Sequence, residues 1–263
     1  MKVFVIVPAA GLGTRMAPPA PLSTKPQPRK ASPSKQFKEL GDVPILVHTL
    51  RKFAAVPAVY EIVIALRRSE ISGFRAQLEK QFPEILDKRI QFVEGGEHRQ
   101  NSVANALARL AADPTDLVLV HDAVRPFVTP EIINDVIAVA QKHNAAIAGW
   151  PAVDTVKQVE RTAEGALIKA TIPRAGIVMA QTPQGFRYDI LRKAFDDAAA
   201  DGFLGTDEAS LIERAGLPVA VVMGSARNIK ITTPADMELA EFYLKSSTQH
   251  PVPSARYPVP STR

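Results

Sequence analysis

The 263-residue sequence contains no cysteine, and this absence removes several kinds of chemistry at once. It excludes a disulfide framework, a thiolate metal site and a cysteine nucleophile. The five histidines are scattered and none forms a His-Glu-x-x-His pattern, so no dedicated zinc site is expected. A Gly-x-Ser-x-Gly nucleophile elbow is also missing. We therefore interpret His121 as a packed or hydrogen-bonding side chain and not as half of a catalytic dyad.

Long apolar runs and a one-sided charge distribution are missing as well. The apolar run Val3–Val7 is short and meets Pro8, which is typical of a buried first strand and not of a signal peptide or a membrane span. The net charge is +5, but acidic and basic residues are mixed without a long basic run, so we expect no nucleic-acid partner. With 46% hydrophobic residues, the chain is predicted to be globular and cytoplasmic, without a membrane partner.

Short apolar runs that alternate with longer amphipathic segments define the predicted fold. The expected strands are Val3–Val7, Ile62–Leu66, Ile90–Val93, Leu117–Val120, Ala145–Trp150 and Val219–Met223. The expected helices are Ile45–Ala55, Ile71–Phe82, Ser102–Ala111, Ile132–Lys142, Ile190–Ala199 and Asp236–Leu244. Thr129-Pro130 and Thr233-Pro234 are typical helix starts, with a capping hydroxyl before proline. Because helices separate strands rich in Val, Ile and Leu, we predict an α/β fold with a Rossmann-like, mostly parallel sheet and helices on both faces.

Three segments break this alternation, and they set the predicted domain limits. Residues 17–34 are rich in Pro, Ser and Lys and are expected to form a flexible loop. Residues 151–172 alternate polar and apolar side chains around Glu164-Gly165, as a protruding β-hairpin would. Residues 247–263 hold four prolines and no acidic residue, which is typical of a disordered tail. The sequence thus predicts a single domain over residues 1–246.

The clearest local signal is the segment Pro8-Ala9-Ala10-Gly11-Leu12-Gly13-Thr14-Arg15-Met16, directly after the first strand. Ligands of doubly wound sheets bind beyond the carboxyl ends of strands, and small residues let consecutive backbone N–H groups form an anion-binding nest. Arg15 would add a cation with bidentate geometry for phosphate oxygens. A dinucleotide fingerprint would need Gly or Ala in place of Met16, and a Walker loop would need Gly-Lys-Ser/Thr. The alternative to an anion site is a plain glycine-rich turn.

This loop resembles the signature of the nucleotidyltransferases that activate sugars and polyol phosphates. Together with further motifs, from about residue 2 to residue 244, it is most similar to the 2-C-methyl-D-erythritol 4-phosphate cytidylyltransferase family. Any one of the motifs is weak, but their order and spacing are specific. The matching segments are Ser34-Lys35-Gln36-Phe37, Gly95–Ser102, His121–Pro126, Asp154-Thr155, Arg174, Thr182-Pro183-Gln184, Thr206–Ser210 and Asn228–Thr232.

The resemblance implies a reaction in which the phosphate of a polyol phosphate attacks the α-phosphate of CTP and pyrophosphate leaves. It implies that Arg15 and Lys35 stabilise the charge that builds on the α-phosphate oxygens, and that Arg174 and Lys230 position the attacking phosphate. Catalysis of this kind depends on positioning and electrostatic stabilisation. The alternative for Lys230 is a solvated lysine near a strand end.

The same resemblance implies the binding residues. CTP is expected against Pro8, Ala9, Ala10, Gly11, Gly13, Gly95, Gly96, Ser102, Asp122 and Ala123. The polyol phosphate is expected against Asp122, Arg125, Thr155, Arg174, Thr206 and Lys230. Mg²⁺ is implied as the cofactor, and no residue of the chain is predicted to be its ligand. For Asp122, a structural cap or an ion pair with Arg125 is the alternative role.

Two departures from the family pattern concern the catalytic lysine. The stretch between Arg15 and Lys35 is longer and richer in proline than usual, and Ser34 stands where a proline usually precedes the lysine. Lys25 is therefore a rival for the role. The continuation Lys-Gln-Phe and then Leu40-Gly41 matches the family and favours Lys35.

The resemblance also bears on assembly and on the choice of acceptor. In the family, the arm at residues 151–172 crosses to a second subunit, which implies a homodimer with a shared acceptor pocket. A ribitol 5-phosphate cytidylyltransferase shares most of these motifs and is the first alternative function. The second alternative is a non-catalytic nucleotide-binding protein, which the presence of both Arg15 and Lys35 argues against.

Overall fold

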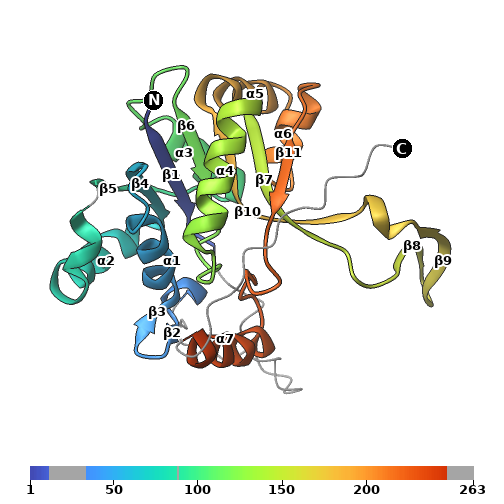
Figure 1. Ribbon diagram of the computed structural model, residues 1–263, viewed down its shortest axis with the longest axis horizontal. Coiled ribbons are helices and arrows are strands. Elements are labelled where there is room, and N and C mark those ends of the chain that lie inside the picture. The colour runs from blue at the N-terminus through green and yellow to red at the C-terminus, as the bar shows by residue number, and fades with distance from the viewer. Residues whose placement is uncertain (12–33, 88, 248–263) are drawn as a thin grey trace.

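The computed structural model describes residues 1–11, 34–87 and 89–247, and its centre is a seven-stranded sheet (Figure 1). The strands lie in the order β11-β7-β10-β6-β1-β4-β5. Their bounds are β1 Val3–Pro8, β4 Val59–Leu66, β5 Arg89–Glu94, β6 Leu117–Val120, β7 Ala145–Pro151, β10 Val178–Arg187 and β11 Ala220–Met223. β10 is antiparallel to its neighbours β6 and β7, and the other neighbouring pairs are parallel. The predicted α/β fold with a mostly parallel sheet is therefore confirmed.

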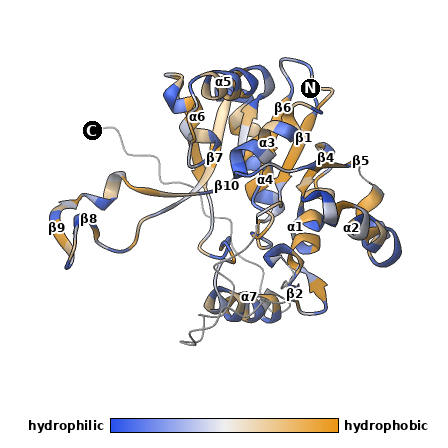
Figure 2. Cartoon of the chain, turned by 180° about the vertical axis from the view of Figure 1, so that it is seen from behind, coloured by the Kyte–Doolittle hydropathy of each residue, from blue (hydrophilic) through white to orange (hydrophobic). Residues whose placement is uncertain are grey.

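Side chains alternate along the strands, and helices bury both faces of the sheet. On β1, Val3, Val5 and Val7 belong to one buried cluster, whereas Phe4 and Ile6 belong to the other. The first face is covered by α1 (Ile45–Ala54), α2 (Arg68–Gln81) and α4 (Pro130–His143). The second face is covered by α3 (Arg99–Leu107), α5 (Tyr188–Ala200) and α6 (Glu208–Arg214). Burial on both faces explains why the central strands are apolar along their length, as the orange β1 in Figure 2 shows.

The C-terminal helix α7 (Pro234–Ser247) lies below the sheet in Figure 1 and contacts the small sheet of β2 (Glu39–Leu40) and β3 (Val43–Pro44). A third buried cluster connects these elements to the segment before α7 and to the loop after β6: Leu40, Ile45, Val124, Ile231 and Ala240. Segments that are far apart in the sequence are thus fixed to each other by one small core.

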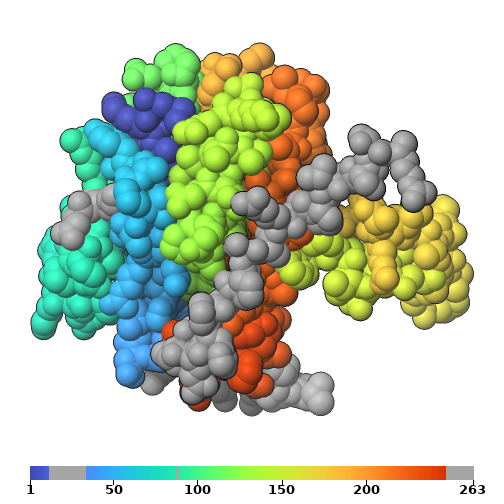
Figure 3. Space-filling model, in the orientation of Figure 1, coloured from blue at the N-terminus to red at the C-terminus, as the bar shows by residue number. Residues whose placement is uncertain are grey.

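A β-hairpin projects from one side of the molecule (Figures 1 and 3). It consists of β8 (Val156–Thr162) and β9 (Gly165–Ile172), which pair antiparallel. Gly165 closes the turn with a φ of 146°, a conformation that favours glycine. Several apolar side chains of the hairpin and its base are exposed: Val153, Val159, Leu167, Ile168 and Met179. The protruding hairpin predicted for residues 151–172 is confirmed.

The predicted strands and helices are all present, with ends that differ by a few residues. Both predicted helix starts are also confirmed. The Ile132 amide donates to Thr129 Oγ1 at 3.4 Å, and the Asp236 amide donates to Thr233 Oγ1 at 3.2 Å. Residues 17–33 and 248–263, where a loop and a tail are predicted, lie outside the described residues. None of the described helices has the length and apolarity that crossing a bilayer requires.

The sequence does not predict β10 or α6. β10 has buried glutamines at 181 and 184 and a proline at 183, which interrupt the apolar pattern of a strand. The glutamines are tolerated because their amides are hydrogen-bonded, Gln181 Nε2 to Ser225 O at 2.8 Å and Gln184 Nε2 to Asp207 Oδ2 at 2.7 Å. α6 has only seven residues, too few for a helical period to be recognised.

Candidate active site

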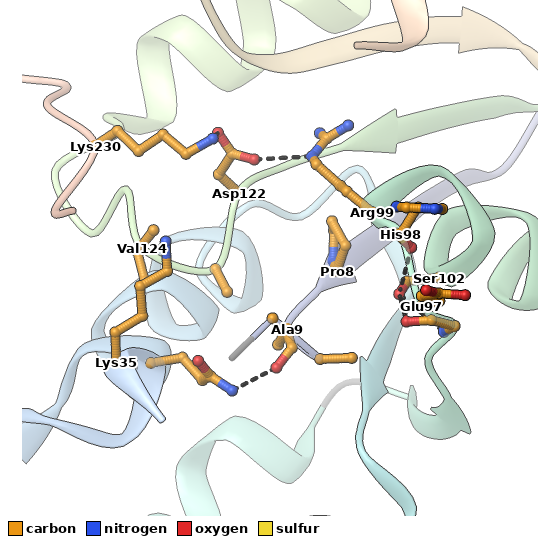
Figure 4. Close-up of a pocket in the computed structure, with 15 residues that line it drawn as sticks. Pro8, Ala9, Lys35, Glu97, His98, Arg99, Ser102, Asp122, Val124 and Lys230 are labelled. Carbon is orange, nitrogen blue, oxygen red and sulfur yellow. Dashed lines mark hydrogen bonds and ion pairs between the residues drawn. The ribbon is translucent and has the colours of Figure 1, made fainter. Parts of the chain in front are cut away.

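A cleft opens where the central parallel strands end (Figure 4). The loop after β1 contributes residues 8–11, the start of α3 contributes residues 96–99 with Ser102, and the loop after β6 contributes residues 122–124. The short η2 helix (Lys35–Phe37) and Lys230, which precedes α7, complete the wall. This is the edge at which doubly wound sheets bind their ligands.

The loops after β1 and β5 approach each other closely because Gly95 has no side chain. The Gly95 amide continues the strand pairing by donating to Leu66 O at 2.8 Å. A Cβ atom on Gly95 would lie 2.3 Å from Ala10 Cβ and 2.9 Å from Ser102 Oγ, so any larger residue would push the loops apart. A glycine at position 95 is therefore a packing requirement of the cleft wall, whatever ligand the cleft takes, whereas Gly11 has open space around its Cβ position.

The start of α3 is fixed by a reciprocal cap. The His98 side chain accepts a hydrogen bond from the amide of Asn101, and Asn101 Oδ1 accepts one from the His98 amide at 3.1 Å. Ser102 Oγ accepts a hydrogen bond from the Gly96 amide at 3.0 Å. Ser102 is buried, so its hydroxyl holds the shape of the loop that forms this side of the cleft.

Lys35 lies on the cleft wall between two buried neighbours. On one side, Gln36 Nε2 donates to Ala9 O at 2.5 Å, which ties η2 to the loop after β1. On the other side, Ser34 Oγ donates to Glu70 Oε1 at 2.8 Å. The backbone of Lys35 is thus held at both ends while its side chain reaches the cleft.

The centre of the site is a cluster of five charged side chains, which are Asp122, Arg99, Arg125, Lys230 and Glu208. Arg99 Nε lies 3.1 Å from Asp122 Oδ1, while Arg125 Nε and Lys230 Nζ lie 3.2 Å and 3.0 Å from Oδ2. In Figure 4, Lys230 and Arg99 reach Asp122 from opposite sides. Arg99 Nη1 also donates to both oxygens of the buried Glu208, at 2.7 Å and 2.9 Å. Three cations and two carboxylates leave one net positive charge, which suits an anionic ligand.

Burial and charge act against each other in this cluster. Burial raises the pKa of Asp122, but the cations of Arg99, Lys230 and Arg125 outweigh it and hold that pKa well below its usual range. Burial also raises the pKa of Glu208, and Arg99 opposes that rise by donating to both of its oxygens. The pKa of Arg99 is raised because its attraction to Glu208 and Asp122 outweighs the cost of burial. Each charge is therefore tolerated only because of its neighbours.

His121 lies next to the cluster and is hydrogen-bonded to Thr182 and to the backbone of Arg125. Its Nδ1 lies 3.1 Å from Thr182 Oγ1 and its Nε2 lies 3.1 Å from Arg125 O. Burial lowers the pKa of His121 to about 4, so the ring is neutral at pH 7. The carbonyl must accept from Nε2–H, which leaves Nδ1 to accept from the Thr182 hydroxyl, while Thr182 Oγ1 accepts the Asp122 amide at 3.0 Å. The interpretation of His121 as a hydrogen-bonding histidine is confirmed.

Asn228 fastens the segment that carries Lys230. Its Nδ2 donates to Thr182 O at 2.9 Å, and its carbonyl accepts from Arg125 Nη1 at 2.7 Å. The buried Asn228 thereby joins the segment before Lys230 to β10 and to the loop after β6.

Protein metal ligands do not gather at this site. Within residues 1–11, 34–87 and 89–247, no three Asp, Glu or His side chains are placed to hold a metal ion. Both oxygens of Asp122 are already paired with cations. A divalent cation here would therefore depend on the phosphates of a bound nucleotide for its ligands.

Comparison with known proteins gives one consistent result. The family model described as "IspD: 2-C-methyl-D-erythritol 4-phosphate cytidylyltransferase" matches residues 3–246. The chain belongs to this family. A protein of that name from Acidobacterium capsulatum is 57% identical over 245 residues, which cover 93% of this chain and 98% of the relative. The crystal structure of the cytidylyltransferase from Francisella tularensis has a TM-score of 0.73 and 34% identity and covers 92% of this chain and 99% of that one.

A second relative and a second structure agree with this result. The cytidylyltransferase of Solibacter usitatus is 52% identical over 246 residues, covering 93% of this chain and 96% of the relative. The structure of 4-diphosphocytidyl-2C-methyl-D-erythritol synthase from Anaerococcus prevotii has a TM-score of 0.74 and 30% identity, covering 93% and 96% of the two chains. This chain is thus an IspD cytidylyltransferase by family in sequence and in fold.

Many of the site residues predicted from the sequence of this cytidylyltransferase come together. The residues that line one cleft are Pro8, Ala9, Ala10, Gly11, Lys35, Gly96, Ser102, Asp122, Ala123 and Lys230. Gly95 lies directly behind that wall, and Arg125 is joined to it through Asp122. The ion pair of Arg125 with Asp122, the alternative role for Asp122, is also present. Gly13, Arg15 and the rival Lys25 lie outside the described residues.

Three predicted acceptor residues lie away from the cleft wall. Thr155 is exposed on the hairpin arm, and Arg174 lies at its base, where Nη1 donates to Val153 O at 2.5 Å. Thr206 is exposed in the turn before α6. Within the described part of one chain, none of the three lines the cleft.

Two charged residues of the site have no role in the sequence-based prediction. Arg99 and Glu208 belong to matching motifs, yet only a folded chain shows that they meet. The segment around Glu208, Thr206-Asp207-Glu208-Ala209-Ser210, is mostly polar and gave no sign that this carboxylate is buried and needs a cationic partner. The identity of that partner was not predictable, since it lies 109 positions away.

Proposed function

We propose that this chain catalyses the reaction for which its family is named. It transfers CMP from CTP to 2-C-methyl-D-erythritol 4-phosphate and releases pyrophosphate and 4-diphosphocytidyl-2-C-methyl-D-erythritol, a step of non-mevalonate isoprenoid biosynthesis. The observation that carries the proposal is the cleft at the strand ends, which is lined by three cationic side chains: Lys35, Lys230 and Arg99. A nucleotide triphosphate and a polyol phosphate are both anions that such a cleft attracts.

The chemistry requires cations at two places. The acceptor phosphate attacks the α-phosphorus of CTP in line, the bond to the β-phosphate oxygen breaks, and negative charge builds on the α-phosphate oxygens. Lys35, with Arg15, supplies positive charge to those oxygens. Lys230, with Arg174, holds the attacking phosphate, which would otherwise be repelled by the triphosphate. The positions of Lys35 and Lys230 on one wall support this division.

The nucleotide is proposed to bind along the loops after β1 and β5. Pro8–Gly11 and Gly95–Ser102 provide backbone groups next to small side chains, which is the surface that a base and a ribose can approach closely. The close approach of the two loops at Gly95 is proposed to exclude the larger purine bases. This tightness supports selection of cytosine.

Mg²⁺ is proposed to enter with CTP. The chain offers no cluster of carboxylates among its described residues, so the triphosphate would supply the ligands of the metal ion. The bound ion would neutralise part of the triphosphate charge. Because CTP is a cytoplasmic metabolite, the cytoplasm is the proposed location of the reaction.

The hairpin arm is proposed to complete the acceptor pocket of a second copy. Thr155 lies on the arm and Arg174 at its base, and the arm projects from the body of its own chain (Figure 3). The exposed apolar side chains Leu167 and Ile168 on the arm, at 67% and 66%, are of the kind that an interface between subunits covers. A twofold homodimer places two such arms symmetrically.

The deciding experiment measures pyrophosphate release from CTP and Mg²⁺ with two acceptors, 2-C-methyl-D-erythritol 4-phosphate and ribitol 5-phosphate. Release with the first acceptor alone is the expected result. Release with ribitol phosphate would keep the mechanism but replace the proposed acceptor. No release with either would favour a non-catalytic nucleotide-binding protein.

A further inference from the structure

Glu208 is a buried acid that the proposed mechanism leaves without a task. It is 1% exposed and lies in the first turn of α6. Both of its oxygens accept from one nitrogen, Nη1 of Arg99, at 2.7 Å and 2.9 Å. Burying a carboxylate is costly, so a pair of this kind is retained where it fixes a geometry or where its loss would leave a charge unpaired.

The start of α6 is itself held rigidly. Asp207 caps the helix, with Oδ1 accepting the Ser210 amide at 3.0 Å. The side chain of Gln184 on β10 then joins α6 to the central sheet, because Nε2 donates to Asp207 Oδ2 at 2.7 Å and Oε1 accepts the Ala209 amide at 3.1 Å. Glu208 therefore reaches Arg99 from a position fixed to the sheet.

Arg99 connects Glu208 to the cleft, because its guanidinium contacts both Glu208 and Asp122. Its Nη1 donates to Glu208, which fixes the orientation of the guanidinium plane, and in that orientation Nε donates to Asp122 Oδ1 at 3.1 Å. Asp122 Oδ2 then remains for Lys230, whose Nζ lies 3.0 Å away, and for Arg125. Without Glu208, the guanidinium of Arg99 would be free to turn, offer Nε and Nη2 to both oxygens of Asp122 in a bidentate pair, and compete with Lys230.

We infer that Glu208 is a positioning residue that acts through Arg99 and Asp122 to hold Lys230 where the acceptor phosphate binds. The inference rests on the proposed function, because it assigns Lys230 to the acceptor. Glu208 does not line the cleft and is assigned no chemical step. Its effect is to keep a flexible lysine at one place on the wall.

The test is the isosteric substitution Glu208→Gln in the full chain, alone and combined with Lys230→Ala. We expect Glu208→Gln to weaken binding of methylerythritol phosphate by about tenfold, measured by calorimetry, and to raise the acceptor KM equally, with the KM for CTP nearly unchanged. In the Lys230→Ala background the same substitution should add nothing. A purely structural role would lower stability and affect both substrates in either background.

Glu61→Gln is the matched control, because Glu61 is another buried glutamate, on β4, and takes no part in the Asp122 cluster. It should leave acceptor binding unchanged even if it changes stability. If Glu208→Gln fails to fold, Arg99→Met with Glu208→Leu removes the ion pair as a unit and avoids an unpaired buried charge. This double variant removes the guanidinium of Arg99 that would compete with Lys230 for Asp122, so it should keep the acceptor binding that depends on Lys230. A loss of acceptor binding as large as that of Lys230→Ala would overturn the inference.

The outcomes separate the inference from the proposed function. Acceptor binding that is unchanged in Glu208→Gln but lost in Lys230→Ala would overturn the inference, as would an equal effect of Glu208→Gln in both backgrounds. If the unmodified protein binds the acceptor but releases no pyrophosphate, the proposed function fails and the binding measurements still decide the role of Glu208. If it binds no acceptor at all, both fail.

Discussion

A lysine carries a compact charge on a flexible stem, so its surroundings decide what it can do. Lys230 is restrained by an oxygen of Asp122 at 3.0 Å, and Lys35 is flanked by the buried Ser34 and Gln36. The same residue type is thus restrained in two ways, through its charged head and through its backbone.

Lys35→Ala is expected to lower kcat by roughly 10²–10³-fold, the usual effect of removing one preorganised charge donor from a transition state. The KM for CTP should change much less, because the phosphates retain their other contacts. Steady-state pyrophosphate release measures both constants. Lys25→Ala is the control and should remain active. An inactive Lys25→Ala beside an active Lys35→Ala would transfer the role to Lys25.

His121 predicts a pH dependence of stability. Its pKa of about 4 in the folded chain lies below the ordinary value of 6.5, so the unfolded chain binds more protons between these values. The contribution of His121 to the free energy of unfolding is complete above pH 6.5. It is lost as the pH falls towards 4, by roughly 3 kcal/mol in all. The depressed pKa of Asp122 acts below this window.

Denaturant unfolding of the wild type and His121→Gln at several pH values between 4 and 7 measures this contribution. The difference in unfolding free energy should shrink as the pH falls. Burial lowers the pKa of His48 in the same direction, and comparing the two proteins cancels its effect. Parallel pH profiles for both proteins would contradict the assignment.

At the scale of elements, the cleft depends on how closely two loops approach. Gly95→Ala would place a methyl group 2.3 Å from Ala10 Cβ, so it should destabilise the fold by about 1–3 kcal/mol and raise the KM for CTP. Gly73→Ala is the matched control. Gly73 lies within α2 with open space around its Cβ position, so the same change should stabilise by about 1 kcal/mol.

Thermal unfolding and CTP kinetics of Gly95→Ala and Gly73→Ala test whether the close approach of the two loops shapes the cleft. Opposite signs of the change in Tm, with a kinetic effect only for Gly95→Ala, are expected. If both variants behave alike, the close approach of the loops is not what shapes the cleft.

The elements that could be predicted share a physical property. Strands such as Val3–Pro8 are buried on both faces and so are apolar throughout, and helices such as α4 show a cap and a period. β10 could not be predicted, because its buried glutamines are compensated by hydrogen bonds to distant segments. Local patterns reveal elements whose stability is local or purely apolar, and they miss elements whose polar groups are satisfied from elsewhere.

At the scale of the whole molecule, the hairpin arm raises the question of which chain completes which pocket. If the arms are exchanged in a dimer, each site uses Lys35 of one copy and Arg174 of the other. A mixed dimer of Lys35→Ala and Arg174→Ala then contains one intact site and one doubly defective site. Sites built within one chain would give no intact site in any mixture.

Unfolding and refolding an equal mixture of the two variants tests this exchange. Random pairing gives half mixed dimers, so about one quarter of wild-type activity should return at low acceptor concentration. Each variant refolded alone is the control and should remain weak. Failure of the mixture to recover activity, with mixed dimers verified by two affinity tags, would show that the arm does not complete its partner's site.

The sequence by itself determined the α/β alternation, the protruding hairpin and the family, because burial, capping and the order of motifs are written in local patterns. It also predicted Lys35, Asp122 and Lys230 as site residues, and the fold brings all three to one cleft. Only the tertiary structure decided that Asp122 is shared by three cations and that Glu208 lies behind Arg99. Such a network joins segments up to 109 positions apart, and its energy depends on distances and burial that exist only after the sheet has brought those segments together.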